Sequence, residues 1–348
     1  MSFNPNEIAP SNNNIFGFPF TEDEARIILI PVPWDATASY RAGTSMGPEA
    51  ILAASPQLDF FDFDIPEVWN IGINMLPVSE KWIEINDGTR GESECYLDML
   101  SKGLSASNNV EMTEIINEVN KQSIELNKYV EETCKHYLSK NKLVGVIGGE
   151  HSVPLGFMKA LSEIHTSFGI LHIDAHADLR NSYEDFEFSH ASIMFNALKL
   201  KSVSNLTQVG IRDFCQDEYQ LINKDKRINT FFDYNLKEQK YKGKSWDAIC
   251  DEIIVSLPEK VYISFDIDGL TPNYCPNTGT PVPGGLDYSE AEYIIRKLAK
   301  SGKQIIGFDL SEVTPGADEW DANVGARLIF LLSNMMYLSL ERRKNSEF

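Results

Sequence analysis

Acidic side chains and a histidine alternate directly after an apolar segment in the middle of the chain. Residues 169–178 read GILHIDAHAD, so Asp174, His176 and Asp178 are spaced two apart. In an extended backbone, alternate side chains point to the same face. These three groups would therefore converge at the carboxyl end of a strand, which is where open parallel sheets bind their ligands.

Two further apolar segments end in groups of the same kind. Residues 261–268 end with Asp266 and Asp268, and residues 143–151 end with His151. Carboxylates packed together raise each other's pKa unless a cation neutralises them. The combined set of carboxylates and imidazoles predicts two divalent cations that share bridging carboxylates. Nitrogen and oxygen donors without cysteine suit Mn²⁺ best, and the imidazoles leave Fe²⁺, Ni²⁺ or Zn²⁺ open.

Strands and helices are expected to alternate through most of the chain. Apolar, β-branched segments predict buried strands, and apolar residues at helical spacing predict helices between them. Strands are expected at 26–32, 143–147, 169–174, 205–210, 261–266 and 304–310, and helices at 44–52, 112–137, 153–161, 191–200, 246–257, 288–300 and 324–340. Fully apolar strands that alternate with helices predict an α/β fold, in which helices cover both faces of a parallel sheet.

The ends and one central region carry weaker signals. Residues 1–20 are rich in Asn and Pro and predict an extended N-terminal arm, whereas 21–348 contain no linker or repeat and predict a single domain. Between 60 and 110 we expect a short strand at 68–72 and turns at 87–91 and 105–109.

Composition excludes several classes of partner. The formal net charge of −20 argues against nucleic acid and anionic membrane surfaces, and it favours a small cationic substrate. Five widely spread cysteines without a C-x-x-C pair suit a reducing compartment. We read no signal peptide at the N-terminus and no apolar run long enough to span a membrane. A cytoplasmic location is therefore expected.

Six short motifs together resemble the ureohydrolase (arginase/agmatinase) family, and especially its agmatinase-like members. They are GGEHS at 148–152, DAHAD at 174–178, SHAS at 189–192, SFDIDGLTP at 264–272, TGTP at 278–281 and GFDLSEVTP at 307–315. The resemblance implies a three-layer α/β/α fold with a central, mostly parallel sheet of about eight strands. It also implies two Mn²⁺ ions, with Ni²⁺ or another divalent cation possible, and a homo-oligomer that is a trimer or hexamer.

The same resemblance implies ligand sets for the two cations. The first Mn²⁺ would be held by His151, Asp174, Asp178 and Asp266, and the second by Asp174, His176, Asp266 and Asp268. Asp174 and Asp266 would then bridge the pair.

The implied reaction is attack of a metal-bridging hydroxide on a guanidino carbon, followed by collapse to urea and an amine. Asp268 would help to hold the nucleophile and accept its proton, and His190 would carry protons to the leaving amine. Glu312 would orient the guanidinium through two parallel hydrogen bonds, with Asp309 as the alternative. His172, inside a strand, is expected to be a core or supporting residue.

Substrate choice depends on residues 180–187, which are expected to line the mouth of the site. Their three acids, Glu184, Asp185 and Glu187, favour a cationic tail, so agmatine, giving putrescine and urea, is the favoured substrate. Arginine, guanidine, 4-guanidinobutyrate and formimidoylglutamate remain alternatives, because an arginine could bind a carboxylate. The candidate substrate contacts are Glu312, Arg180, Asn181 and Glu184.

Two other classes of protein fit the sequence less well. A zinc deacetylase-like amide hydrolase would use one metal and a pair of histidines, whereas the doubled Asp266 and Asp268 call for two metals. A non-catalytic metal-binding or regulatory protein would have lost a ligand, and none is missing.

Overall fold

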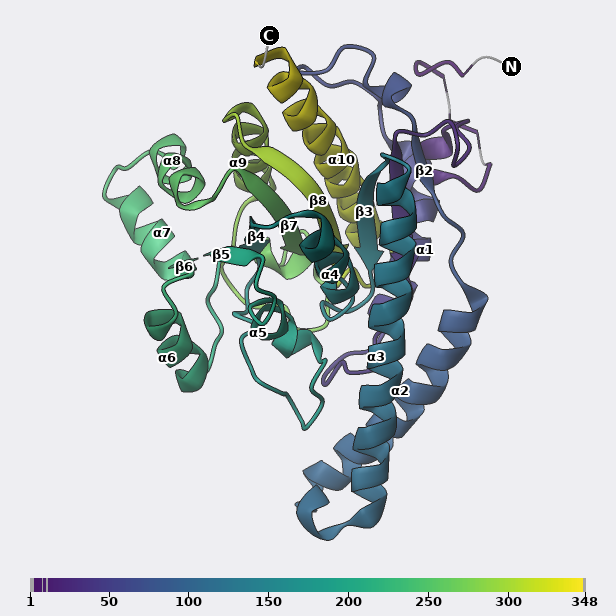
Figure 1. Cartoon of the computed structure of the whole chain (residues 1–348), viewed down its shortest axis with the longest axis vertical. Coiled ribbons are helices and arrows are strands. Elements are labelled where there is room, and N and C mark those ends of the chain that lie inside the picture. The colour runs from purple at the N-terminus through teal and green to yellow at the C-terminus, as the bar shows by residue number, and fades with distance from the viewer. Residues whose placement is uncertain (1–2, 8, 11, 347–348) are drawn as a thin grey trace.

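The computed structural model describes residues 3–7, 9–10 and 12–346. Its centre is one eight-stranded sheet in the order β2-β1-β3-β8-β7-β4-β5-β6 (Figure 1). The strands are β1 Ile27–Val32, β2 Ile73–Met75, β3 Leu143–Gly148, β4 Phe168–Ile173, β5 Val203–Val209, β6 Ile228–Phe231, β7 Lys260–Asp266 and β8 Gln304–Ser311. Every neighbouring pair is parallel. The α/β fold and the number of strands are confirmed.

Helices cover both faces of the sheet, because its strands are apolar on both sides. One hydrophobic core lies under α1 Gly47–Ala54, α7 Asp233–Tyr241, α8 Trp246–Ser256, α9 Tyr288–Lys300 and α10 Trp320–Ser346. The other lies under α3 Val110–Ser139, α4 Leu155–Ile164, α5 Ile193–Ala197 and α6 Gln216–Lys224. The three expected layers are therefore present.

The region between 60 and 110 differs from the expectation. Residues Val68–Ile71 form a 3-10 helix, and the short strand follows at β2. No turn interrupts 87–91, which lie inside α2, Glu80–Ser101. Trp82, Asn86 and Thr89 recur on its buried side, so packing against α3 outweighs the two glycines that suggested a turn.

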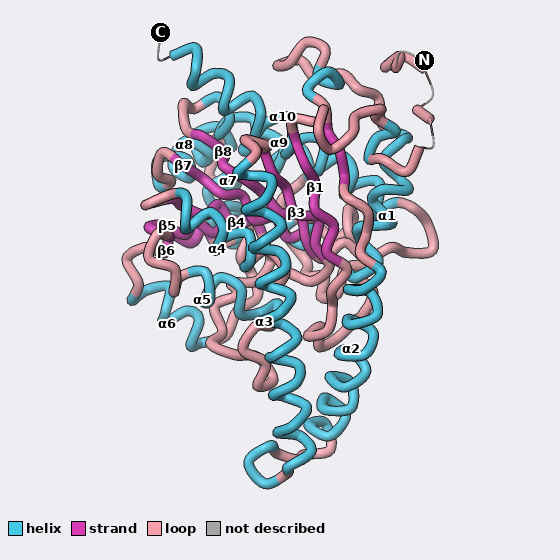
Figure 2. Tube along the Cα trace, turned by 45° about the vertical axis from the view of Figure 1, so that its right-hand side comes forward, coloured by secondary structure: helices cyan, strands magenta, loops and turns pink. Residues whose placement is uncertain are grey.

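Helices α2 and α3 form a long hairpin that extends away from the body of the molecule (Figures 1 and 2). The hairpin contacts two loops. Asp35 exchanges two hydrogen bonds with Asn86 of α2, at 2.7 and 3.0 Å. In the other loop, Asp185 accepts a hydrogen bond from the Tyr96 hydroxyl at 2.5 Å, and Phe186 is buried beside that ring. The hairpin thereby fixes loops 35–45 and 181–189.

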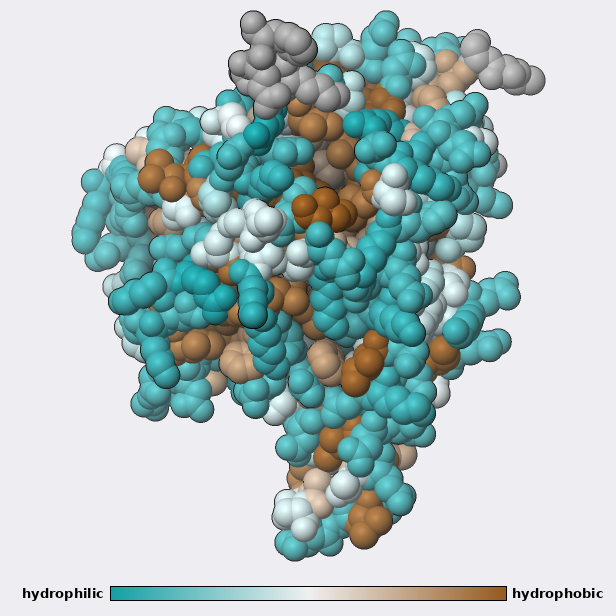
Figure 3. All heavy atoms as spheres, in the orientation of Figure 1, coloured by the Kyte–Doolittle hydropathy of each residue, from teal (hydrophilic) through white to brown (hydrophobic). Residues whose placement is uncertain are grey.

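The N-terminal segment, expected to be extended, places Ile15, Phe16 and Phe18 in the core beside Phe60 and Phe330. Residues 1, 2, 8, 11, 347 and 348 of the expected arm and domain lie outside the described residues. The surface seen in Figure 3 is largely hydrophilic, with separate hydrophobic patches. Within the described residues, none of the helices combines the length and apolarity that crossing a bilayer requires.

Gly149 allows the end of β3 to pass close to a neighbouring segment. A Cβ at this position would overlap the backbone of Trp34. The next residues, Glu150 and His151, follow directly, so this close approach sets where they lie.

We expect Gly149→Ala to destabilise the protein by about 1–3 kcal/mol, because overpacking a fixed backbone forces it to move. Thermal or urea unfolding measures this change. Gly88→Ala is the matched control: a Cβ there meets nothing within 4 Å, and Ala in an exposed helix should stabilise the protein by up to about 1 kcal/mol. Equal stability of Gly149→Ala and the wild type would contradict the packing argument.

Candidate metal centre

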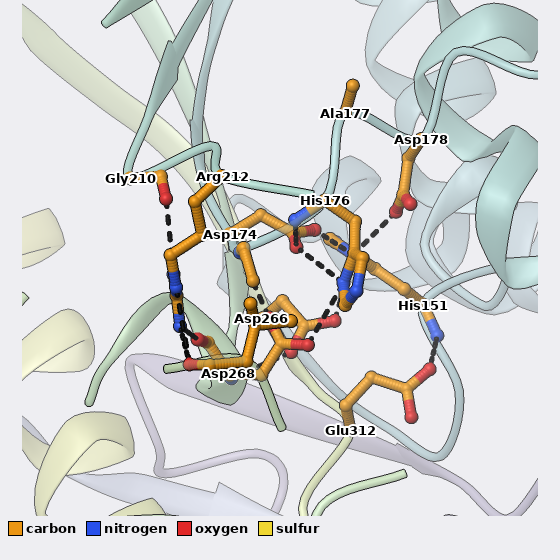
Figure 4. Close-up of polar contacts among 12 residues, drawn as sticks. His151, Asp174, His176, Ala177, Asp178, Gly210, Arg212, Asp266, Asp268 and Glu312 are labelled. Atoms are coloured by element: carbon orange, nitrogen blue, oxygen red, sulfur yellow. Dashed lines mark hydrogen bonds and ion pairs between the residues drawn. The ribbon is translucent and has the colours of Figure 1, made fainter. Parts of the chain in front are cut away.

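The candidate ligands lie at the carboxyl ends of adjacent strands in the middle of the sheet. The order β3-β8-β7-β4 makes neighbours of the strands that carry them. Asp174 follows β4 directly and Asp266 is the last residue of β7, while His151 lies three residues beyond β3. Figure 4 shows the side chains of all six predicted ligands turned toward one another.

Potential ligand atoms form two groups that share Asp174: one contains His151, His172, Asp174 and Asp178, and the other contains Asp174, His176 and Asp268. In the first, His151 Nδ1 lies 3.0 Å from Asp174 Oδ2 and 3.1 Å from Asp178 Oδ2. Asp266 Oδ2 is 3.3 Å from the same nitrogen. In the second, His176 Nδ1 lies 3.1 Å from Asp268 Oδ2 and 3.5 Å from Asp174 Oδ1. The structure therefore brings all six predicted ligands together.

The buried acids repel one another. Burial and the charge of Asp174 raise the pKa of Asp178 to about 7. Burial, with the charges of Asp268 and Asp174, raises the pKa of Asp266 well above its usual value. A cation between the carboxylates would remove this penalty.

His151 presents a free ring nitrogen to the acids. Its Nε2 lies 2.9 Å from the Ser264 hydroxyl and 3.8 Å from Asp309 Oδ2. Its buried Nδ1 makes no hydrogen bond within the described part of the chain, although carboxylate oxygens surround it. A proton on Nε2 leaves a lone pair on Nδ1, which is the form that binds a metal. The donor set therefore fits divalent cations.

Glu312 lies immediately after β8, beside the cluster. It adopts a left-handed φ of 65°, and its Oε1 accepts a hydrogen bond from the backbone N–H of His151 at 2.8 Å. Burial and the charge of Glu150 raise its pKa well above the usual value. Glu312 lines a narrow space of about 20 Å³ together with His151 and Asp266. Asp309, the alternative, is fully buried inside β8.

A cavity of about 440 Å³ connects the cluster with the surface. His176 and Asp178 lie in its wall, together with Arg180, Tyr183 and His190. The Arg180 guanidinium lies over the Tyr183 ring at 4.5 Å and 3.8 Å from Glu218. This wall is therefore aromatic and carries charges of both signs.

The predicted acids of the mouth do not face this cavity. Its lining, among the described residues, includes neither Asn181, which is exposed, nor Glu184. Asp185 binds the Tyr96 hydroxyl, and Glu187 lies 3.7 Å from Lys199. Left-handed φ values at Glu184 and Asp185 turn the segment toward the hairpin, so the expectation that these three acids line the mouth is wrong.

His190 lines the cavity beside Tyr183, with ring centroids 5.8 Å apart. Burial, aided by the nearby His176, lowers its pKa to about 4. This value lies below the ordinary one of about 6.5 expected from the sequence. His190 is therefore neutral at pH 7 and can accept a proton.

Sequence reasoning missed three residues around the site. Arg212 donates hydrogen bonds to the carbonyls of Asp268 and Leu270 and so holds the loop that carries Asp268. Asp213 and Arg41 line the cavity, and their side chains make no hydrogen bond or ion pair with the described residues. The acid Asp213 lies four residues beyond the end of β5, too far from the strand for period-two spacing to indicate it.

Two relatives resemble this chain in sequence, and a solved structure resembles it in fold. The chain is 30% identical to N(1)-aminopropylagmatine ureohydrolase of Synechocystis sp., over 84% of this chain and 82% of the relative. It is 28% identical to agmatinase of Halalkalibacterium halodurans, over 85% and 86%. The agmatine ureohydrolase structure of Thermoplasma volcanium superposes with a TM-score of 0.71 at 23% identity, covering 95% of this chain and 97% of that one.

The family match covers the segments that build the cluster. The model of the arginase family matches residues 25–333, which include every strand of the sheet and all six predicted ligands. Members of this family depend on a binuclear metal centre. The chain therefore belongs to the arginase family, and it is a ureohydrolase.

Proposed function

We propose that the protein hydrolyses agmatine to putrescine and urea. The observation that carries this proposal is a pair of adjoining spaces. Glu312 lines the narrow one, which shares His176, Asp178 and His190 with the larger cavity, and the wall of that cavity includes Asp213. A guanidinium would be held at the inner end, and an ammonium would be held by the outer acid. Agmatine carries one cation at each end.

The cluster would hold two cations through His151, Asp174, His176, Asp178, Asp266 and Asp268. When bound, two divalent cations lower the pKa of a water molecule and so supply a nucleophile at neutral pH. Mn²⁺ suits these donors best, with Ni²⁺ as the alternative. Asp268 would accept the proton of the nucleophile.

Glu312 would orient the substrate. Its Oε1 is held by the backbone of His151, while the side chain faces the narrow inner space. A carboxylate there binds a guanidinium through parallel hydrogen bonds and fixes its plane for attack. His190, neutral in the cavity wall, would accept a proton and pass it to the leaving amine.

N(1)-aminopropylagmatine is the second candidate substrate. A cavity of about 440 Å³ has room for more than a four-carbon amine, and relatives at 30–31% identity carry this substrate in their names. A second ammonium would also suit the net charge of −20. The longer tail of N(1)-aminopropylagmatine would lie toward the aromatic rim of the cavity, where Phe214 and Tyr40 are exposed.

We also propose that the protein is cytoplasmic and forms a homo-oligomer, a trimer or hexamer. The family resemblance supports this assembly. All five cysteines are free thiols, which supports a reducing cytoplasm.

A urea-release assay on the metal-loaded protein tests the substrate. We expect kcat/KM for agmatine or N(1)-aminopropylagmatine to exceed that for arginine, 4-guanidinobutyrate and guanidine by at least about tenfold, because an ammonium at Asp213 adds about 1.4 kcal/mol or more. The assay is run with Mn²⁺ and with Ni²⁺. Preference for a carboxylate-bearing substrate would overturn the proposal.

Asp213→Asn should raise KM for agmatine about tenfold or more, because it removes the negative charge proposed to hold the ammonium. Butylguanidine, which lacks that ammonium, should be turned over equally by the variant and the wild type. Asp217→Asn, an exposed acid in the first turn of α6, is the control. An unchanged KM for agmatine would remove Asp213 from the proposed site.

His190→Ala should lower kcat by about 10²–10⁴-fold, because the leaving amine must be protonated and general acid–base catalysis contributes about this much. Metal content, measured by elemental analysis, should stay at the wild-type level. His136→Ala, on the exposed side of α3, controls for loss of a histidine. Wild-type turnover by His190→Ala would exclude it as the proton carrier.

A further inference from the structure

Three polar side chains lie side by side on neighbouring strands next to the metal centre. His172 of β4 is the register partner of Gln208 of β5, and Gln208 is the partner of Thr230 of β6. His172 and Gln208 are fully buried. None of the three belongs to the predicted site, and each buried polar group here needs a partner.

The hydrogen bonds fix the orientation of the Gln208 amide. The Thr230 hydroxyl donates to Gln208 Oε1 at 2.9 Å, and Gln208 Nε2 donates to the carbonyl of Ala177 at 2.8 Å. A carbonyl can only accept, so the amide nitrogen must face Ala177. The same nitrogen lies 3.0 Å from His172 Nδ1, to which its second N–H donates.

The amide in turn fixes the proton of His172. Because Nδ1 accepts from Gln208, the ring proton is on Nε2, which lies 2.7 Å from Asp174 Oδ2 and donates to it. The other oxygen of this carboxylate, Oδ1, accepts from the backbone N–H of His176 at 2.6 Å. Both nitrogens of His172 are thus engaged, and the imidazole cannot itself bind a metal although it lies within the cluster.

We propose that Gln208 is a positioning residue for the metal centre: it keeps the His172 proton on Nε2 and thereby holds the Asp174 carboxylate in the orientation in which it would bind metal. This inference rests on the proposed ligand role of Asp174. It makes no use of the identity of the substrate. Mutation of a residue that hydrogen-bonds to a metal ligand typically lowers metal affinity by about 10–100-fold.

Metal binding to the full-length apoprotein tests the proposal. Gln208→Met keeps the length and removes both donors, and we expect the Kd for Mn²⁺, measured by competition with a chelator, to rise at least about tenfold. Thr207→Val is the matched control. Thr207 is the adjacent buried residue of β5, its hydroxyl meets Ser256 and Asn205, and its variant should bind Mn²⁺ like the wild type.

The position of the proton on the His172 ring distinguishes a positioning role of Gln208 from a purely structural one. In apoprotein labelled with ¹⁵N-histidine, His172 should give the Nε2–H tautomer in the wild type and in Thr207→Val. The carboxylate of Gln208→Glu accepts hydrogen bonds but cannot donate them, so it should place a proton on Nδ1 of His172 and weaken Mn²⁺ binding. If Gln208→Met does not fold, Gln208→Glu still tests the proposal.

Wild-type Mn²⁺ affinity and an Nε2–H signal in a folded Gln208 variant would overturn the inference. The outcome is independent of the substrate assay, because metal affinity and tautomer are measured without substrate. A protein that fails to release urea from agmatine but loses Mn²⁺ affinity in Gln208→Met would refute the proposed substrate and support the positioning role.

Discussion

Repulsion among buried carboxylates is the constraint on which this structure depends. Asp174, Asp178, Asp266 and Asp268 meet at the ends of adjacent strands, where little water reaches them. Burial, together with this repulsion, raises the pKa values of Asp178 and Asp266. Such a cluster is tolerable when divalent cations lie between its members, which links the architecture directly to the chemistry of a ureohydrolase.

The surrounding protein keeps the ligands from relaxing away from one another. Arg212 donates a hydrogen bond to the carbonyl of Asp268, and the Ser264 hydroxyl lies within hydrogen-bond distance of Nε2 of His151. Farther out, the α2–α3 hairpin anchors the two loops whose residues line the cavity. Hydrogen bonds from the surrounding residues therefore hold the repelling carboxylates in place, so the site is preformed.

The inner end of the cavity suits the type of reaction, and its outer wall suits the choice of substrate. The inner end consists of the ligand cluster and Glu312, which suit any guanidinium. The outer part combines Arg41, Arg180, Asp213 and exposed aromatic rings. We propose that substrate choice in this protein depends on these few loop residues, which can change without disturbing the sheet.

The sequence by itself determined six of the eight strands and the residues of the cluster, because period-two spacing after apolar segments is a local property that the backbone converts directly into a shared face. It therefore predicted the α/β fold and which residues meet at the cluster. Contacts between distant segments decided three features that local sequence patterns do not encode. Packing against α3 kept residues 87–91 helical, burial of Phe186 turned Glu184 and its neighbours from the cavity, and the strand order placed Asp213 at its wall. These outcomes depend on contacts between distant segments, for which the spacing of residues along the chain carries no signal.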